Sequence, residues 1–135
     1  MPKEWVLKRY KGILKLIFFY PLSLSEKLIK ILPKNQNKIF FSDNGSTAVE
    51  IAIKVALQYF FNKGEKKTTI IAFENAFHGD TFAAMAASGI SFFTEAFQGS
   101  LLDVVRIPVP TFENKKATLE QLETLLVTKE YAAFI

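Results

Sequence analysis

Apolar runs of strand length alternate with segments of helical periodicity from about residue 22 onward. Strands are predicted at residues 39–42, 68–73, 103–107 and 131–135, and helices at 23–32, 47–60, 81–88 and 118–127. Helices that separate strands in this way favour a parallel sheet with helices packed on its faces. The sequence therefore predicts an α/β fold with a mostly parallel sheet and helices on both faces.

Three of these helices have a predicted start at a capping-box spacing, in which a hydroxyl residue is followed three positions later by Glu or Gln. The pairs are Ser23 with Glu26, Thr47 with Glu50, and Thr118 with Gln121. Pro33 is expected to end the first helix, and Asn62-Lys63-Gly64 the second. Residues 89–100 are expected to be irregular.

The basic character of the chain is confined to its first 20 residues. The whole sequence has 17 Lys and Arg against 13 Asp and Glu, a net charge of +4. Residues 1–20 hold five basic residues and one acidic residue, so residues 21–135 are neutral. A neutral body without a basic stripe argues against nucleic-acid binding.

We interpret residues 1–20 as a basic, apolar leader and residues 21–135 as part of one large domain. The leader is expected to be an amphipathic helix or a loosely folded end, with a secretion signal as the weaker alternative, because Lys15 and Pro21 interrupt its apolar run. No stretch reaches the roughly 20 apolar residues of a membrane-spanning helix. A cytoplasmic location without membrane attachment is expected, and the absence of cysteine is compatible with it.

The absence of cysteine also excludes thiol nucleophiles and cysteine-based metal sites. The single histidine cannot form a histidine-rich metal site alone. No metal site is therefore predicted.

Ligands of parallel α/β sheets lie at the carboxyl ends of the strands, so two loops become candidate sites. In the first, Gly45 is expected to let the backbone turn, and Ser46 and Thr47 open a long helix. Free amides, a positive helix end and two hydroxyls could hold one compact phosphate. A plain turn followed by an N-cap is the competing interpretation.

The second loop, residues 75–81, places Phe77 beside His78, the only histidine. Phe77 could stack on a flat ring, although a Phe-His pair taken alone is more often a core aromatic beside a hydrogen-bonded histidine. Gly79-Asp80 could form a turn and an N-cap. Together the two loops suit an aromatic phosphate ester such as pyridoxal phosphate.

Two segments carry a family resemblance: Phe41-Ser42-Asp43-Asn44-Gly45-Ser46-Thr47-Ala48-Val49-Glu50 and Asn75-Ala76-Phe77-His78-Gly79-Asp80-Thr81-Phe82. They resemble the class III (ornithine/GABA-type) pyridoxal-phosphate aminotransferases. The resemblance implies the large domain of a fold-type-I transferase, covering about residues 22–110 and less clearly the remainder. It implies that Gly45, Ser46, Phe77 and His78 bind the cofactor. Gly45 and Ser46 would hold its phosphate, and Phe77 would cover the pyridine ring and contact substrate.

Within this family the chain is most similar to the biotin-pathway branch. That branch moves the amino group of S-adenosylmethionine to 8-amino-7-oxononanoate and forms homodimers. His78-Gly79-Asp80-Thr81-Phe82, Phe93-Thr94 and Ile107-Pro108-Val109-Pro110 carry this likeness. Phe77 stands where that branch commonly has Tyr, which leaves open other class III enzymes that act on ornithine, acetylornithine or 4-aminobutyrate.

No catalytic residue is predicted in the chain. The cofactor-binding lysine and the carboxylate that this chemistry needs lie further along in the family. The 135 residues are thus expected to be a fragment of such an enzyme, inactive alone. A non-catalytic α/β remnant that binds a phosphate ester or a protein is the alternative.

Overall fold

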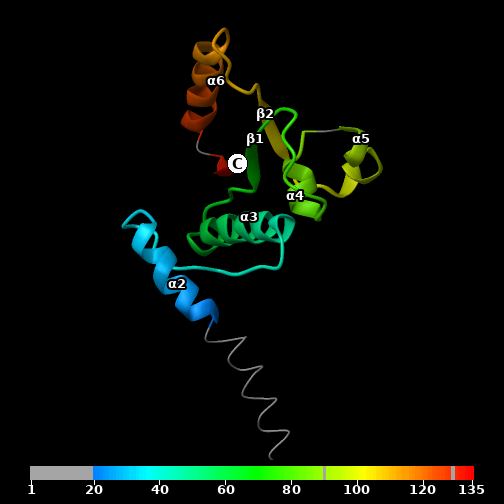
Figure 1. The fold of residues 1–135 in the computed structure, drawn as a ribbon. Coiled ribbons are helices and arrows are strands. Elements are labelled where there is room, and N and C mark those ends of the chain that lie inside the picture. Colours follow the sequence, from blue (N-terminus) through cyan, green and yellow to red (C-terminus); the bar gives the residue numbers. More distant parts are fainter. Residues whose placement is uncertain (1–19, 90, 129) are drawn as a thin grey trace, which may run out of the picture. The chain divides into compact units, whose positions relative to one another are not determined.

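The structure, a computed structural model, describes residues 20–135 with the exception of residues 90 and 129. The chain divides into two compact units, one ending at Phe41 and the other running from Ser42 to Ile135. In the first unit, helix α2 spans Tyr20–Ile31 (Figure 1). The predicted leader of residues 1–20 lies outside the described residues, apart from Tyr20.

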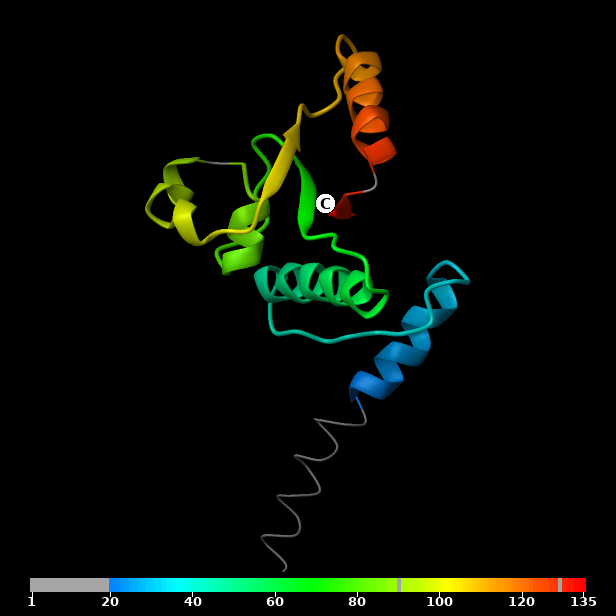
Figure 2. The same cartoon turned by 180° about the vertical axis from the view of Figure 1, so that it is seen from behind.

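The second unit contains every described strand and the remaining helices. In chain order its elements are α3 (Gly45–Asn62), β1 (Thr69–Phe73), α4 (Phe82–Ala87), α5 (Ser91–Thr94), the 3-10 helix η2 (Glu95–Ser100), β2 (Val104–Ile107), α6 (Lys115–Thr128) and β3 (Tyr131–Phe134). The strands form a parallel sheet of order β2-β1-β3 (Figures 1 and 2). The predicted parallel α/β fold is thereby confirmed.

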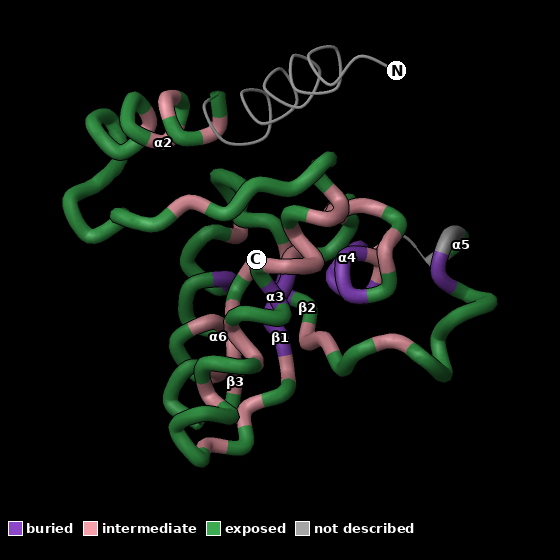
Figure 3. The backbone as a smooth tube through the Cα atoms, turned by 90° about the horizontal axis from the view of Figure 1, so that it is seen from below, coloured by how far each residue is buried: buried purple, intermediate pink, exposed green. Residues whose placement is uncertain are grey.

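Strand β1 is the centre of the sheet and is covered on both faces. Ile70, Ile71 and Ala72 are consecutive and fully buried, although successive side chains of a strand point to opposite faces. Helix α3 packs against β3, α4 against β1 and α6 against β2. Burial is concentrated on β1 and α4 (Figure 3).

The hydrophobic core joins α3, β1 and α4 through small and branched side chains. Its buried members are Ile53, Ile70, Ala83 and Ala87, and half-buried apolar residues pack around them: Val49, Leu57, Val104, Ala132, Ala133 and Ile135. Full burial of a side chain the size of isoleucine contributes about 1.5–3 kcal/mol. The alanines let α4 approach its neighbours closely, which holds the loop before α4 near α3.

The strand predicted at residues 39–42 is absent. These residues form an irregular segment, with Phe40 exposed at 76% and Phe41 at 45%. A short apolar run indicates burial only where a neighbouring strand can pair with its backbone, and no described strand pairs with this one. The other three predicted strands are present within one residue of their expected ends.

The predicted capping boxes are wrong at all three helices. Helix α2 includes Ser23 and α6 includes Thr118, so both residues lie within a helix rather than at its start. Helix α3 is capped by Asn44, three residues before Thr47.

Residues 91–100, expected to be irregular, form α5 and η2. Helix α3 ends at Asn62, before Lys63 and Gly64, as predicted.

Candidate functional site

The start of α3 is organised by a reciprocal pair of hydrogen bonds. Asn44 Oδ1 accepts from the Thr47 amide at 2.9 Å, and Thr47 Oγ1 accepts from the Asn44 amide at 3.3 Å. The helix therefore begins at Gly45, which is helical and makes none of the sharp turn expected there. No described residue accepts a hydrogen bond from the amide of Gly45 or Ser46. Two free donors thus remain at the positive end of an 18-residue helix.

The loop between β1 and α4 contacts this helix start at Ser46. Gly79 has φ of +122°, a conformation that side chains of L-residues rarely adopt. A Cβ atom on Gly79 would lie 2.9 Å from Ser46 Cα and would overlap the Ser46 hydroxyl. Glycine is required because the two backbones approach closely.

Thr81 fixes the same contact with hydrogen bonds. Its amide donates to Ser46 Oγ at 3.0 Å, and the Ser46 and Thr81 hydroxyl oxygens lie 3.0 Å apart. Thr81 Oγ1 also lies 3.3 Å from Ser46 O. These bonds join residues 35 positions apart in the sequence. Thr81, and not the predicted Asp80, is the N-cap residue of α4.

The two loops enclose a broad, open hollow of about 600 Å³. It is lined by Asn44, Gly45, Ser46, Phe77, His78, Gly79, Asp80 and Thr81. The four residues predicted to bind a cofactor, Gly45, Ser46, Phe77 and His78, are all among them. The structure therefore brings together two segments that the sequence analysis singled out separately.

The aromatic residues of the hollow differ in their exposure. Phe77 is 59% exposed, so its ring is available to a flat ligand rather than packed in the core. His78 is half-buried, and its Nε2 atom is buried without a hydrogen-bond partner among the described residues. Burial lowers the pKa of His78 below its usual value of 6.5, because a charged imidazolium loses solvation.

Thr47 does not line the hollow, although the sequence suggested that its hydroxyl could bind an anion there. Its Oγ1 instead donates within the cap, with Asp43 Oδ1 2.8 Å away. This hydrogen bond is the main cause that lowers the pKa of the Asp43 carboxyl. The Thr47 hydroxyl is therefore occupied by hydrogen bonds at the N-terminal cap of α3.

Glu50 is a residue of the site's framework whose role the sequence analysis missed. Its Oε2 accepts from the amide of Ala83 at 2.8 Å and from that of Ala84 at 3.4 Å. A carboxylate at the start of α4 satisfies free amides and complements the positive helix end. The spacing between Thr47 and Glu50 indicated a local capping box, so the long-range hydrogen bonds of Glu50 to α4 were not predicted.

Three comparisons bear on the family of the chain. The family model for aminotransferase class III matches residues 15–135. The chain belongs to the class III aminotransferases. It is 42% identical over 120 residues to an adenosylmethionine-8-amino-7-oxononanoate aminotransferase of Synechococcus elongatus, covering 83% of this chain and 28% of that protein. A protein of the same name from Staphylococcus aureus is 38% identical over 129 residues, covering 84% and 28%.

A solved structure leads to the same family. The crystal structure of adenosylmethionine-8-amino-7-oxononanoate aminotransferase from Methanocaldococcus jannaschii superposes with a TM-score of 0.74 at 33% identity, covering 84% of this chain and 26% of that one. The fold is thus that of part of a pyridoxal-phosphate-dependent aminotransferase. The chain spans between a quarter and a third of the length of these relatives, from 26% to 28%.

Class III aminotransferases use pyridoxal phosphate, and the hollow has features that fit this group. The free amides of Gly45 and Ser46 are donors suited to a phosphate. The missing Cβ of Gly79 keeps the loop against Ser46, and the exposed Phe77 ring offers a face to a pyridine ring. The residues of this class III chain therefore fit the cofactor.

Two further properties concern only the described residues. None of their helices combines the length and the hydrophobicity needed to cross a bilayer. Nor do three or more of their His, Asp and Glu side chains gather closely enough to hold a metal ion.

Proposed function

We propose that this chain forms the phosphate-binding part of the pyridoxal-phosphate site of a class III aminotransferase. The observation that carries the proposal is the contact between Ser46 and the Gly79–Thr81 segment. It places free helix amides and an exposed aromatic ring around one hollow. An anion and a flat ring joined in one ligand match that pair of features.

Each residue of the hollow has a distinct part in this proposal. The amides of Gly45 and Ser46 bind the phosphate, and the Ser46 hydroxyl, already oriented by Thr81, adds a polar contact. Phe77 stacks on the pyridine ring and contacts the substrate. His78 lines the hollow as a neutral imidazole near pH 7, because its pKa is lowered.

When bound, the cofactor would carry the amino group from one substrate to the other, and its ring would act as an electron sink. The residues described above bind and orient it, and none of them is assigned a catalytic role. The eight residues that line the hollow include no lysine. We expect the lysine and the carboxylate of the reaction in the part of the family's length that these 135 residues do not cover, so the chain is expected to be inactive alone.

The substrates proposed for the complete enzyme follow the names of its relatives. S-adenosylmethionine would be the amino donor and 8-amino-7-oxononanoate the acceptor, giving 7,8-diaminononanoate for biotin synthesis. The enzyme would act as a homodimer in the cytoplasm. Phe77 carries no hydroxyl toward the substrate, which is the observation that favours the second candidate, another class III aminotransferase acting on ornithine, acetylornithine or 4-aminobutyrate.

Binding of pyridoxal phosphate to the chain, measured by isothermal titration, tests the proposed site. Gly79→Ala should weaken binding by about tenfold or more, since the added Cβ forces the loop away from Ser46. Gly99→Ala is the matched control, because a Cβ there meets nothing within 4 Å. Circular dichroism would verify that both variants fold. Absence of binding to the unmodified chain, or equal binding by both variants, contradicts the proposal.

The amino donor is tested with the complete gene product loaded with pyridoxal phosphate. S-adenosylmethionine, ornithine and 4-aminobutyrate are supplied separately, and the appearance of the amino form of the cofactor is followed by absorbance. Conversion by S-adenosylmethionine alone supports the proposed reaction. Conversion by one of the others assigns a different class III activity, and conversion by none supports the non-catalytic alternative.

A further inference from the structure

Helix α4 is too short to be stable by itself. It has six residues, and isolated helices shorter than about 12–15 residues are marginal in water. Thr81 makes no side-chain cap to it, because its hydroxyl is engaged with Ser46. Side chains from other elements instead satisfy the ends of α4. Glu50 of α3 does so at the start, and Arg106 of β2 does so at the other end.

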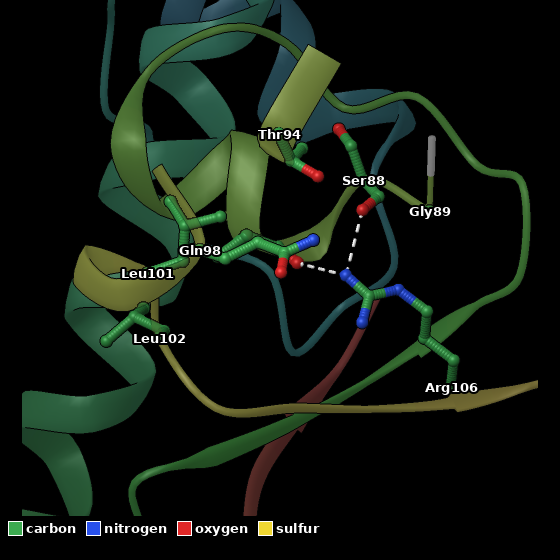
Figure 4. Close-up of a pocket in the computed structure, with 8 residues that line it drawn as sticks. Ser88, Gly89, Thr94, Gln98, Leu101, Leu102 and Arg106 are labelled. Atoms are coloured by element: carbon green, nitrogen blue, oxygen red, sulfur yellow. Dashed lines mark hydrogen bonds between the residues drawn. The ribbon is translucent and has the colours of Figure 1, made fainter. Parts of the chain in front are cut away.

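Arg106 binds the carbonyl groups at the end of α4 with a single nitrogen atom. Its Nη2 donates to Ala86 O at 2.7 Å and to Ser88 O at 2.9 Å (Figure 4). The last carbonyls of a helix have no partners within the helix and carry a partial negative charge, so a guanidinium is favourable there. The side chain borders a hollow of about 330 Å³ that is distinct from the candidate cofactor site.

The segment that Arg106 binds also forms hydrogen bonds with the residues immediately before and after Phe77. Ser88 Oγ accepts from the His78 amide at 2.9 Å, and the Gly89 amide donates to Ala76 O at 2.8 Å. Phe77 lies between the two tethered residues. A Cβ on Gly89 would overlap the Asn75 amide, so the two backbones are in close contact here.

We infer that Arg106 is a positioning residue of the candidate site, which fixes Ser88 and Gly89 and thereby the loop that presents Phe77 to the cofactor ring. Arg106 does not line the hollow and acts only through these hydrogen bonds. The assignment of the ring to a cofactor rests on the proposed function. The effect on the loop does not, and it can be measured without a ligand.

Amide hydrogen exchange of the 135-residue chain tests the loop directly. Arg106→Met should speed exchange of the His78 and Gly89 amides by about tenfold or more, relative to the change at Ile53 in the core, which reports overall stability. In Arg106→Lys, the exchange rates of these two amides should stay close to those of the unmodified chain. Both carbonyls are bound by one nitrogen, and a lysine ammonium has three donors to replace it.

Lys116→Met is the matched control, because it removes one positive charge from a side chain that is 90% exposed on α6. It should leave exchange at His78 and Gly89 unchanged. Unchanged exchange in Arg106→Met, or an equal increase in Arg106→Met and Arg106→Lys, overturns the inference.

Ligand binding separates this inference from the proposed function. Arg106→Met should lower the affinity for pyridoxal phosphate by on the order of tenfold, because the Phe77 ring would no longer be held against the cofactor ring. Inorganic phosphate would contact the α3 amides but no aromatic ring, so its affinity should fall by less than about twofold. Equal losses for both ligands contradict the positioning of Phe77. If the unmodified chain binds neither ligand, the proposed function fails, and hydrogen exchange alone decides whether Arg106 holds the loop.

Discussion

At the scale of single residues, the site depends on the absence of a side chain at Gly79. The sequence placed Gly45 and Ser46 in one candidate loop and Phe77 and His78 in another, and their meeting could be expected because both follow predicted strands. The expected strand before Gly45 is absent from the described residues, and an irregular segment leads into α3 instead, so only the second loop follows a strand. The contact of Gly79 with Ser46 could not be predicted, because no local pattern reports a close approach 33 positions away.

The stability of the chain should depend on pH through His78. Its pKa is lowered in the folded chain, so the unfolded chain binds the proton more readily. The free energy of unfolding should be highest above pH 6.5 and should fall as the pH drops from 6.5 through the lower pKa of the folded state. His78 is the only histidine, and the lowered carboxyl pKa values of Asp43 and Glu65 lie below this range.

Urea unfolding at several pH values between 5 and 8 would measure this effect. His78→Gln is the comparison, since glutamine does not titrate. The difference in unfolding free energy between the two proteins should change with pH only below about 6.5. A constant difference across the range would contradict the prediction.

At the scale of elements, helix starts were the least predictable feature of the fold. Thr47 and Glu50 have the spacing of a capping box, yet Thr47 is the third helical residue and Glu50 binds α4. Local spacing cannot distinguish a carboxylate that bonds its own helix from one that bonds a distant helix. Strand β1 was easier to predict because a continuous apolar run is typical of a buried parallel strand, and β2 and β3 are short runs dominated by apolar residues.

Removing the carboxylate of Glu50 should weaken the junction of α3 and α4. Glu50→Ala leaves the amides of Ala83 and Ala84 without their acceptor, and should lower the free energy of unfolding by about 1–2 kcal/mol. Glu50→Gln keeps an oxygen acceptor and should lower the free energy of unfolding by less than Glu50→Ala does. Glu123→Ala, at an exposed position of α6, is the control and should change stability by less than about 0.5 kcal/mol. Urea denaturation would rank the three variants, and equal losses in Glu50→Ala and Glu123→Ala would refute the role of Glu50.

At the scale of the whole molecule, the described sheet has two open edges. Strands β2 and β3 each pair with β1 on one side, and no described strand pairs with the other side of either. Large apolar side chains are also exposed, including Phe61 at 77% and Phe112 at 89%. Unpaired strand edges and exposed apolar surface favour association between chains.

The 135-residue chain should therefore self-associate with increasing concentration. Phe134→Lys places a charge on the edge strand β3, where the side chain is 44% exposed, and should shift the chain toward monomer. Val127→Lys adds the same charge at a side chain that is 78% exposed on α6 and should have little effect. Light scattering coupled to gel filtration measures the mass, and a monomer of the unmodified chain at all concentrations would disprove the expectation.

The order of the strands also determines when the sheet can form during synthesis. Central strand β1 pairs with β2 through Ile71 and Val105, but its other partner, Phe134 of β3, lies 63 residues away in the sequence. Contacts so distant in sequence form slowly, because a long loop must close first. A nascent chain in which β3 is still inside the ribosome therefore leaves one edge of β1 unpaired.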